Sequence, residues 1–493
     1  MSDCQVLVVG GGPGGSTTAA LLAKQGFDVI LMERQRFPRY HIGESLLPSA
    51  LQILDELGLR ETIESHGFQH KAGALFDWSD DIWHFSFGTP LEPLYAFQVV
   101  RSEFDQILLD HAASVGVDVR QRVEVVELEF DGERPRRATF VDGEGRRGSC
   151  SFDVLVDASG RTGLMATRYL RSRRFHEAFR NVALWGYWRN AAQLGRGPEG
   201  ATASCSIPYG WIWAIPLHDG SLSVGVVLHK SRLKELRETK DLDTIYREAL
   251  DSSPVVRDLV APGELTGSLR TETDYSYAAE RFSGPGYYLV GDAACFLDPL
   301  LSSGIHLATF SGLVAAASIA STLRGEIDEA TASEFFGASY RRAYLRMLVV
   351  VSSFYQMHSG RDAFFKHAQE LTMRDYSKQE LTAAFVNVVS GVEDLVDMEQ
   401  ATSAEVLDSL MGVYSDHYEF LRGWRRGEVQ SLDELRKGVG RMRVVDSAQG
   451  EFSLSPETAV NGLYVKTGSE LGLAVASAAS QPQRQEETSG SAR

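Results

Sequence analysis

The stretch QVLVVGGGPGG, residues 5–15, decides the fold of this 493-residue chain. Its short apolar, β-branched run over residues 5–9 predicts a buried strand, and the glycine cluster leads into a helical pattern over 17–24. A second apolar run over 27–32 completes a strand–helix–strand unit. Such a unit lays its strands side by side in a parallel sheet, so we expect an α/β, Rossmann-like fold with its loops at the carboxyl ends of the strands.

The glycine cluster has the pattern of a dinucleotide site. It matches G-x-G-x-x-G and opens a helix, and its members are Gly10, Gly12, Pro13, Gly14 and Gly15. Glycines let the backbone approach a pyrophosphate at a helix N-terminus, where free N–H groups and the helix dipole favour anions. Glu33 ends the second strand, where a carboxylate holds the ribose hydroxyls of an adenosine. The alternative is a tight glycine turn without a ligand.

The composition excludes several classes of protein. The chain has 49 Lys and Arg against 66 Asp and Glu, a net charge of −17, which is the wrong sign for sequence-independent binding of nucleic acid. Its four cysteines form no C-x-x-C pair, so we expect no disulfide framework, no metal site and a reducing cytoplasm. No apolar run reaches the roughly 18 residues of a membrane helix, and no basic signal peptide opens the sequence, so we expect a soluble protein.

The pattern along the chain suggests three parts. Residues 1–350 read as the cofactor-binding core, and strand-like alternation of Trp, Tyr, Val and Ser predicts an antiparallel sheet inserted at about 181–270, on the substrate side. Residues 351–475 read as a helical C-terminal region. Residues 476–493 carry no large apolar side chain and are expected to form a disordered tail.

Later segments specify the dinucleotide. Gly291 and Asp292 end an apolar run over 287–290 and resemble the second flavin-binding segment of the FAD monooxygenases, whose aspartate takes the ribityl chain. Arg101 stands where that family places an arginine near the flavin. Asp292 alone would also serve as a helix cap. Together with the glycine cluster, these segments predict FAD.

Three motifs then resemble those of the flavin-dependent halogenases. FPRYHIGESLLP, residues 37–48, is similar to a loop shared with related reductases and would bring Gly43, Glu44 and Ser45 to the flavin. GWIWAIP, residues 210–216, matches W-x-W-x-I-P, and FLDPLLSSG, residues 296–304, matches F-x-x-P-x-x-S-x-G. The resemblance covers roughly residues 1–350.

This resemblance implies a reaction that uses FADH2, O2 and chloride or bromide. In the family, halide attacks the flavin C4a-hydroperoxide, and the hypohalous acid travels to a distant substrate. A wall between flavin and substrate would be built from Trp211, Trp213, Ile215 and Pro216. The alternative is that the two tryptophans are ordinary core residues, because aromatic side chains dominate buried sheets.

The resemblance also assigns a halide site and a catalytic lysine. The halide would lie against Ser303 and Gly304, where backbone N–H groups at a helix start bind anions, with Pro299 and Ile305 against the flavin. The alternatives are an ordinary helix cap or a flavin contact without a halide. Lys71, at the start of an apparent strand, would carry or orient the electrophilic halogen, and burial would lower its pKa and make it a better nucleophile. Most lysines are instead solvated surface residues.

One departure from the family narrows the substrate. Members that act on free tryptophan place a glutamate just before the Ser-Ser-Gly turn, where this chain has Leu301. The pattern therefore resembles the branch that chlorinates phenol or pyrrole groups, such as a tyrosine-like group, tethered to a carrier protein in natural-product (antibiotic) biosynthesis. A separate flavin reductase is expected, because no second G-x-G-x-x-G is present. The alternatives are an aromatic hydroxylase or reductase of the same fold, or a non-catalytic flavoprotein that docks on a megasynthase.

Overall fold

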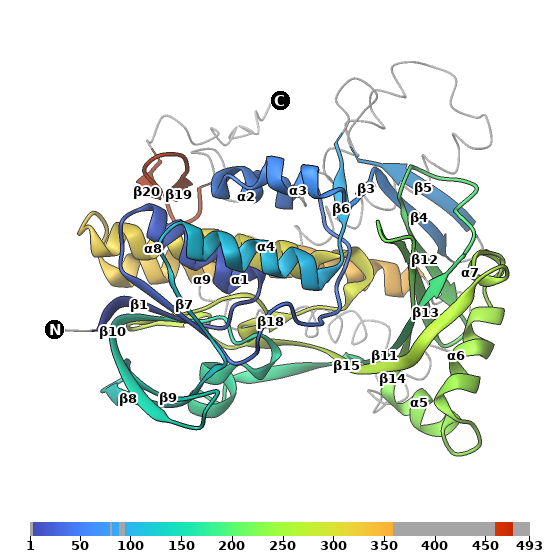
Figure 1. The fold of residues 1–493 in the computed structure, drawn as a ribbon, viewed down its shortest axis with the longest axis horizontal. Coiled ribbons are helices and arrows are strands. Elements are labelled where there is room, and N and C mark those ends of the chain that lie inside the picture. Colours follow the sequence, from blue (N-terminus) through green and yellow to red (C-terminus); the bar gives the residue numbers. More distant parts are fainter. Residues whose placement is uncertain (1–2, 79–80, 88–93, 358–458, 477–493) are drawn as a thin grey trace, which may run out of the picture.

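The computed structural model describes residues 3–78, 81–87, 94–357 and 459–476 (Figure 1). Its first sheet has the order β16-β17-β10-β1-β2-β7. The strands are β1 (Cys4–Val9), β2 (Val29–Glu33), β7 (Asp118–Gln121), β10 (Arg147–Asp157), β16 (Ser283–Gly284) and β17 (Tyr287–Leu289). Strands β17, β10, β1, β2 and β7 run parallel, so their carboxyl ends meet at one edge. The predicted α/β fold is confirmed. A hairpin of β8 (Val123–Asp131) and β9 (Arg134–Asp142) extends from β10.

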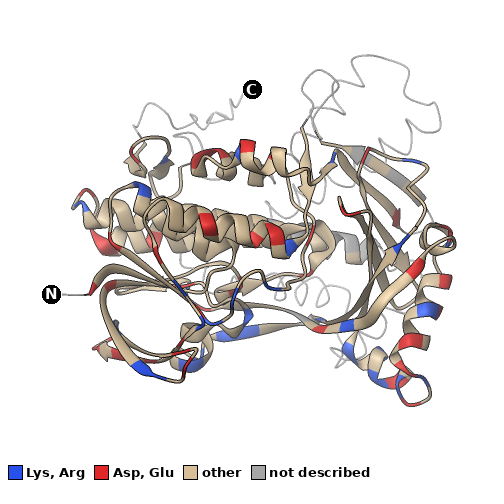
Figure 2. Cartoon of the chain, in the orientation of Figure 1, with Lys and Arg blue, Asp and Glu red and all other residues tan. Residues whose placement is uncertain are grey.

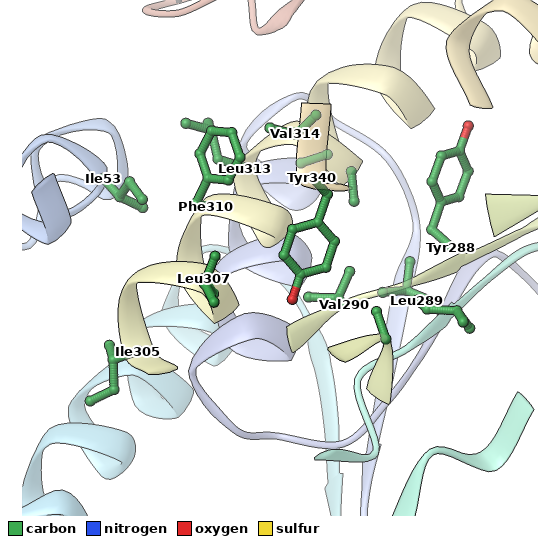
Figure 3. Packing of buried hydrophobic residues seen from close by; sticks show 14 of the residues in the cluster. Ile53, Tyr288, Leu289, Val290, Ile305, Leu307, Phe310, Leu313, Val314 and Tyr340 are labelled. Atoms are coloured by element: carbon green, nitrogen blue, oxygen red, sulfur yellow. The ribbon is translucent and has the colours of Figure 1, made fainter. Parts of the chain in front are cut away.

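Long helices pack together beside this sheet (Figure 1). They are α1 (Pro13–Lys24), α4 (Arg101–Ser114), α8 (Ser303–Leu323) and α9 (Glu329–Met357). Figure 3 shows Leu307 of α8 near Tyr340 of α9 and Val290, which follows β17, while the Phe310 ring of α8 lies beside Leu313; all belong to one buried cluster. By length and composition α8 is apolar enough to cross a membrane, but 89% of its most apolar window is buried inside the protein. It is the central helix of the core.

The second sheet has the order β18-β15-β11-β14-β13-β12-β4-β5. Its strands are β4 (Gly73–Trp78), β5 (Asp81–Ser86), β11 (Arg173–Arg189), β12 (Thr202–Ile207), β13 (Gly210–Pro216), β14 (Leu222–His229), β15 (Glu264–Ala279) and β18 (Cys295–Phe296). Helices α5 (Lys230–Leu236), α6 (Leu242–Asp251) and α7 (Pro254–Val260) pack on this second sheet and carry both basic and acidic residues (Figure 2).

This second sheet is wider than the predicted insertion at 181–270. The inserted part of the sheet runs from β11, which starts at residue 173, to β15, which ends at residue 279. Strands β4 and β5, from the segment before α4, join the same sheet. Strand β12 pairs parallel to β4, so the sheet is mixed rather than purely antiparallel. The pairing of two strands this far apart in the sequence cannot be predicted from the hydrophobic pattern of either strand alone.

The remaining elements frame the motif loops. They are α2 (Ser49–Leu57), α3 (Arg60–His66), a two-stranded ladder of β3 (Gln69–Lys71) and β6 (Ala96–Gln98), and short helical turns at Gly160–Thr162, Leu164–Tyr169, Gly291–Ala293 and Pro299–Leu301. Helix α9 runs past the predicted boundary at residue 350.

The C-terminal prediction needs one correction. A hairpin of β19 (Leu463–Lys466) and β20 (Gly472–Val475) lies in the segment predicted to be helical. Its alternating apolar side chains suit a strand, and the hairpin is tied to α8 because the Leu473 amide donates to Ser321 Oγ at 2.8 Å. The rest of the predicted helical region, 358–458, and the predicted disordered tail from 477 to 493 lie outside the described residues.

Candidate functional site

A cavity of about 510 Å³ opens where the parallel strands end. It is lined by residues that follow β1, β2, β10 and β17, which is the edge where ligands of open parallel sheets bind. Most of the predicted site residues lie on it: Gly10, Gly12, Pro13, Gly14, Gly15, Glu33, Gly43, Glu44, Ser45, Arg101, Trp211, Trp213, Ile215, Gly291, Asp292, Pro299, Gly304 and Ile305. Three others, Lys71, Pro216 and Ser303, do not line it.

The glycine cluster packs too tightly for side chains. A Cβ atom at Gly10, whose φ is +107°, would lie 2.2 Å from the carbonyl oxygen of Ala158, and one at Gly14 would lie 2.7 Å from Val290 Cγ1. Helix α1 begins at Pro13, and its N-cap residue, Gly12, has no side chain with which to cap it. Its first N–H groups therefore remain available to an anion in the cavity.

Charged side chains are fixed on both sides of this helix start. Glu33 accepts from the backbone N–H groups of Gly11 at 2.8 Å and Gln35 at 2.7 Å, which turns its carboxylate toward the cavity edge. Arg101 makes a two-pronged bond to the fully buried Asp105, at 2.8 and 3.0 Å, and Arg39 lies 3.2 Å from the same carboxylate. Two guanidinium groups thus share one carboxylate, which leaves local positive charge beside the cavity.

Two aspartates at strand ends have different tasks. Asp157 accepts from Ser159 N, Ser159 Oγ and Met165 N, so it holds the loop after β10 in place. Asp292 lines the cavity itself, and burial raises its pKa. The sequence prediction placed Asp292 at the ribityl chain, and its position on the cavity is compatible with that role.

The turn before α8 has the features of an anion site. Ser302 adopts a left-handed φ of 59°, and no side chain caps the helix that starts at Ser303. A Cβ atom at Gly304 would meet nothing within 4 Å, so there is open space beside the turn. Ser303 is 1% exposed, and its Oγ has no hydrogen-bond partner among the described residues. The N–H groups at such a helix start favour an anion such as a halide.

Tryptophans line the side of the cavity formed by the second sheet. Trp211 and Trp213 alternate on β13 and so project to the same face, with ring centroids 6.0 Å apart. Trp185 of β11 joins them, 6.4 Å from Trp213. Trp213 fills the space above Gly225 of β14, where a Cβ atom would lie 2.0 Å from its ring. Pro216 ends β13 away from the cavity.

Lys71 is the last residue of β3, and it lies behind the cavity wall. It is 2% exposed, and its Nζ donates to Ser45 Oγ at 2.8 Å and to the Leu46 carbonyl at 3.0 Å. Burial lowers its pKa from 10.5 to about 7. Because Ser45 lines the cavity, the amine is separated from it by one side chain. The solvated-lysine alternative is wrong.

Other residues of the site were not predicted from the sequence. Arg39 and His41 line the cavity from within the 37–48 motif, and burial lowers the His41 pKa to about 4. Tyr355 of α9 accepts from Trp211 Nε1 at 3.0 Å and donates to the buried carboxylate of Asp298 at 2.6 Å. Asp298 also caps the following turn, because its carboxylate accepts from Leu300 N at 3.1 Å. Nothing in the local sequence around residue 355 signals this contact.

These residues fit FAD. The cavity joins an uncapped helix start, a carboxylate at the end of β2, paired arginines and a tryptophan wall, which match in turn a pyrophosphate, a ribose and a flat aromatic ring system. The glycine contacts leave no room for side chains that would block the approach of a pyrophosphate.

Comparison with known proteins points the same way. Residues 5–94 and 90–405 match the family described as tryptophan halogenase. The chain is 44% identical to a tryptophan 2-halogenase of Chondromyces crocatus, over 96% of this chain and 94% of that protein. It is 37% identical to flavin-dependent halogenase ascD of Acremonium egyptiacum, over 92% of this chain and 84% of that protein.

Solved structures agree. The flavin-dependent halogenase CmlS matches with a TM-score of 0.74 and 30% identity, over 96% of this chain and 84% of that one. The myxobacterial chondrochloren halogenase CndH matches with a TM-score of 0.71 and 37% identity, over 79% of this chain and 90% of that one.

Proposed function

The chain belongs to the tryptophan halogenase family of flavin-dependent halogenases, and on that premise we propose that it halogenates an electron-rich aromatic group tethered to a carrier protein, with Lys71 as the catalytic amine. The observation that carries the role of Lys71 is its burial behind Ser45, with a pKa of about 7. A buried amine that is neutral in part near neutral pH can accept or orient an electrophilic halogen.

In this proposal different residues of the cavity bind different parts of FAD and the halide. The first turn of α1 and Glu33 would hold the adenosine diphosphate half of FAD, and Arg101 and Asp292 its flavin half. When bound and reduced, FAD supplies with O2 the oxidising power that turns halide into an electrophile. A separate flavin reductase would deliver FADH2. The N–H groups at Ser303 and Gly304 would hold chloride or bromide, and the tryptophan wall would keep the organic substrate away from the flavin.

Residue 301 supports a tethered phenol or pyrrole over free tryptophan. Leu301 is apolar and stands where a carboxylate would assist a less reactive ring, whereas a phenol needs only a nearby base. Free tryptophan is the second candidate, because a relative that covers 96% of this chain is named a tryptophan 2-halogenase. The two candidates differ in whether the carrier protein is required.

The test supplies the purified protein with FAD, a flavin reductase, NADH, O2 and chloride or bromide. Free tryptophan, free phenols and pyrroles, and the same phenol and pyrrole groups on carrier proteins are offered in parallel, and mass spectrometry reads the halogen isotope pattern. Halogenation of a carrier-bound group alone supports the proposal. Halogenation of free tryptophan at a higher kcat/KM refutes tethering, and an oxygenated product that forms without halide would refute the halogenase assignment itself.

A further inference from the structure

A chain of hydroxyl groups leads from the cavity to the protein surface. Tyr187 of β11 donates its hydroxyl proton to Glu44 Oε1 at 2.6 Å. The hydroxyl oxygens of Tyr187 and Tyr40 are 2.9 Å apart, and Trp185 Nε1 donates to the Tyr40 oxygen at 2.6 Å. Glu44 lines the cavity, and Tyr40 comes from the same motif loop four residues earlier.

The carboxylate of Glu44 at one end of the chain and the indole N–H of Trp185 at the other fix the direction of these hydrogen bonds. When Glu44 is ionised it can only accept, so Tyr187 uses its only proton on the carboxylate and must accept the proton of Tyr40. The indole N–H of Trp185 is a donor only, so it holds the Tyr40 oxygen as an acceptor and leaves the Tyr40 proton for Tyr187. Every hydroxyl in the chain therefore points inward, toward the carboxylate.

Burial changes steadily along the same path. Glu44 is 3% exposed, Tyr187 is half-buried, and Tyr40 is 42% exposed. The guanidinium of Arg270 lies 3.7 Å from the centroid of the Tyr40 ring, at the outer end. Glu44 thus has little direct access to water, while the far end of its hydrogen-bonded chain lies at the surface.

The halogenase reaction consumes a proton, which such a path could supply. FADH2, O2, one halide ion, one aromatic C–H group and one proton yield FAD, the halogenated arene and two molecules of water. Each turnover therefore takes up a proton, although halide arrives as an anion without one. We propose that Glu44, Tyr187 and Tyr40 form the route by which this proton enters the site from solvent.

The transfer balances at every step. Glu44 carboxylate takes the Tyr187 proton, Tyr187 takes the Tyr40 proton, and Tyr40 takes a proton from surface water. Each tyrosine oxygen gains one O–H bond as it loses another, and the net change is one proton moved from the surface to Glu44. The protonated carboxyl then releases its proton into the cavity and returns to the carboxylate. No electrons move, and no group besides water is required.

The surroundings of Glu44 suit both protonation states. Burial raises its pKa to about 7, against the lowering effects of Ser223, Tyr187 and Arg101, while Asp219 raises it further. A carboxyl group that titrates near the working pH can both accept and release a proton at useful rates. The inference rests on the halogenase reaction of the proposed function.

Tyr187→Phe breaks the path and keeps the ring. At saturating FAD and substrate, we expect the rate of halogenation to fall on the order of 100-fold, with a larger solvent deuterium isotope effect. Small weak acids such as imidazolium should restore part of the rate by delivering protons directly. Tyr40→Phe should act in the same direction. Tyr209→Phe is the matched control, because Tyr209 lies in the turn between β12 and β13, against Arg232, and loss of its hydroxyl should change nothing.

A second readout does not depend on catalysis. In the flavin-free protein, infrared difference spectra taken across pH should contain a protonated-carboxyl band that titrates near pH 7 and disappears in Glu44→Gln. In Tyr187→Phe the same band should titrate at higher pH, because the ionised carboxylate has lost a hydrogen-bond donor. Circular dichroism checks that each variant is folded.

Three results would overturn the proposal. One is a wild-type rate in Tyr187→Phe, and another is a slowed rate with an unchanged isotope effect and no rescue by small acids, which marks a structural role. The third is the absence of a carboxyl band that depends on Glu44. If wild-type protein formed no halogenated product at all, the proposed function would fail, whereas the infrared titration would still decide whether Glu44 exchanges protons through Tyr187.

Discussion

Replacing Lys71 with methionine should stabilise the protein at neutral pH. The side chain keeps its length and loses the amine, which is 2% exposed and has a folded-state pKa of about 7 against 10.5 for an ordinary lysine. In the unfolded chain the lysine is protonated at pH 7, so folding must remove that proton or bury the charge. A lysine kept for catalysis therefore costs stability.

The structure sets the size of the effect. At about 1.4 kcal/mol for each tenfold change in proton affinity, the lowered pKa of Lys71 costs about 5 kcal/mol of unfolding free energy below pH 7. The hydrogen bonds to Ser45 and Leu46 offset about 1 kcal/mol each. We expect Lys71→Met to gain about 3 kcal/mol there.

The pH dependence gives this prediction its sign. Between pH 7 and 10.5 the unfolded state binds more protons at Lys71 than the folded state, so wild-type stability rises with pH. The advantage of Lys71→Met should therefore shrink across this window and reverse within it, about two pH units above 7, where only the two lost hydrogen bonds still count. Urea unfolding of flavin-free protein at several pH values measures it, with exposed Lys234→Met as the control. A variant that is destabilised equally at every pH would refute the reasoning.

Three further substitutions test other parts of the site. Gly10→Ala should abolish FAD binding measured by flavin fluorescence, because its Cβ would lie 2.2 Å from the Ala158 carbonyl oxygen; normal affinity would contradict the glycine argument. Gly225→Ala should displace the Trp213 ring and cost about 1–3 kcal/mol in urea unfolding, so unchanged stability and tryptophan fluorescence would argue against the packing. Tyr355→Phe should cost about 1–3 kcal/mol, because it leaves the Trp211 N–H and Asp298 without this partner; a neutral effect would show that water replaces the hydroxyl.

Local patterns predicted which strand ends meet at the cavity. The glycine cluster, Glu33 and the Gly291–Asp292 pair each follow a parallel strand, and the ends of such strands meet at one edge whatever the length of chain between them. The alternation of Trp211 and Trp213 likewise fixed a common face for both rings, since it depends only on strand geometry.

Contacts between segments that are distant in the sequence could not be predicted from the sequence. The pairing of β12 with β4 joins Thr202 to Ala74, and Tyr355 reaches Trp211 from a helix 144 residues further on. Neither contact is reflected in the repeating hydrophobic pattern of a single helix or strand. Lys71 illustrates the same limit, because its motif suggested the start of a strand, whereas the structure ends β3 there and turns the amine toward Ser45.

The central claim is that Lys71 is the catalytic amine of a halogenase. The most direct test compares wild-type protein with Lys71→Ala on the same carrier-bound aromatic substrate, with the same supply of reduced FAD, O2 and chloride. The account predicts that both bind FAD equally, because Lys71 does not line the cavity, and that only the wild type forms a product with the chlorine isotope pattern. Equal chlorination by Lys71→Ala, or a wild-type product that carries oxygen and forms without chloride, would contradict it.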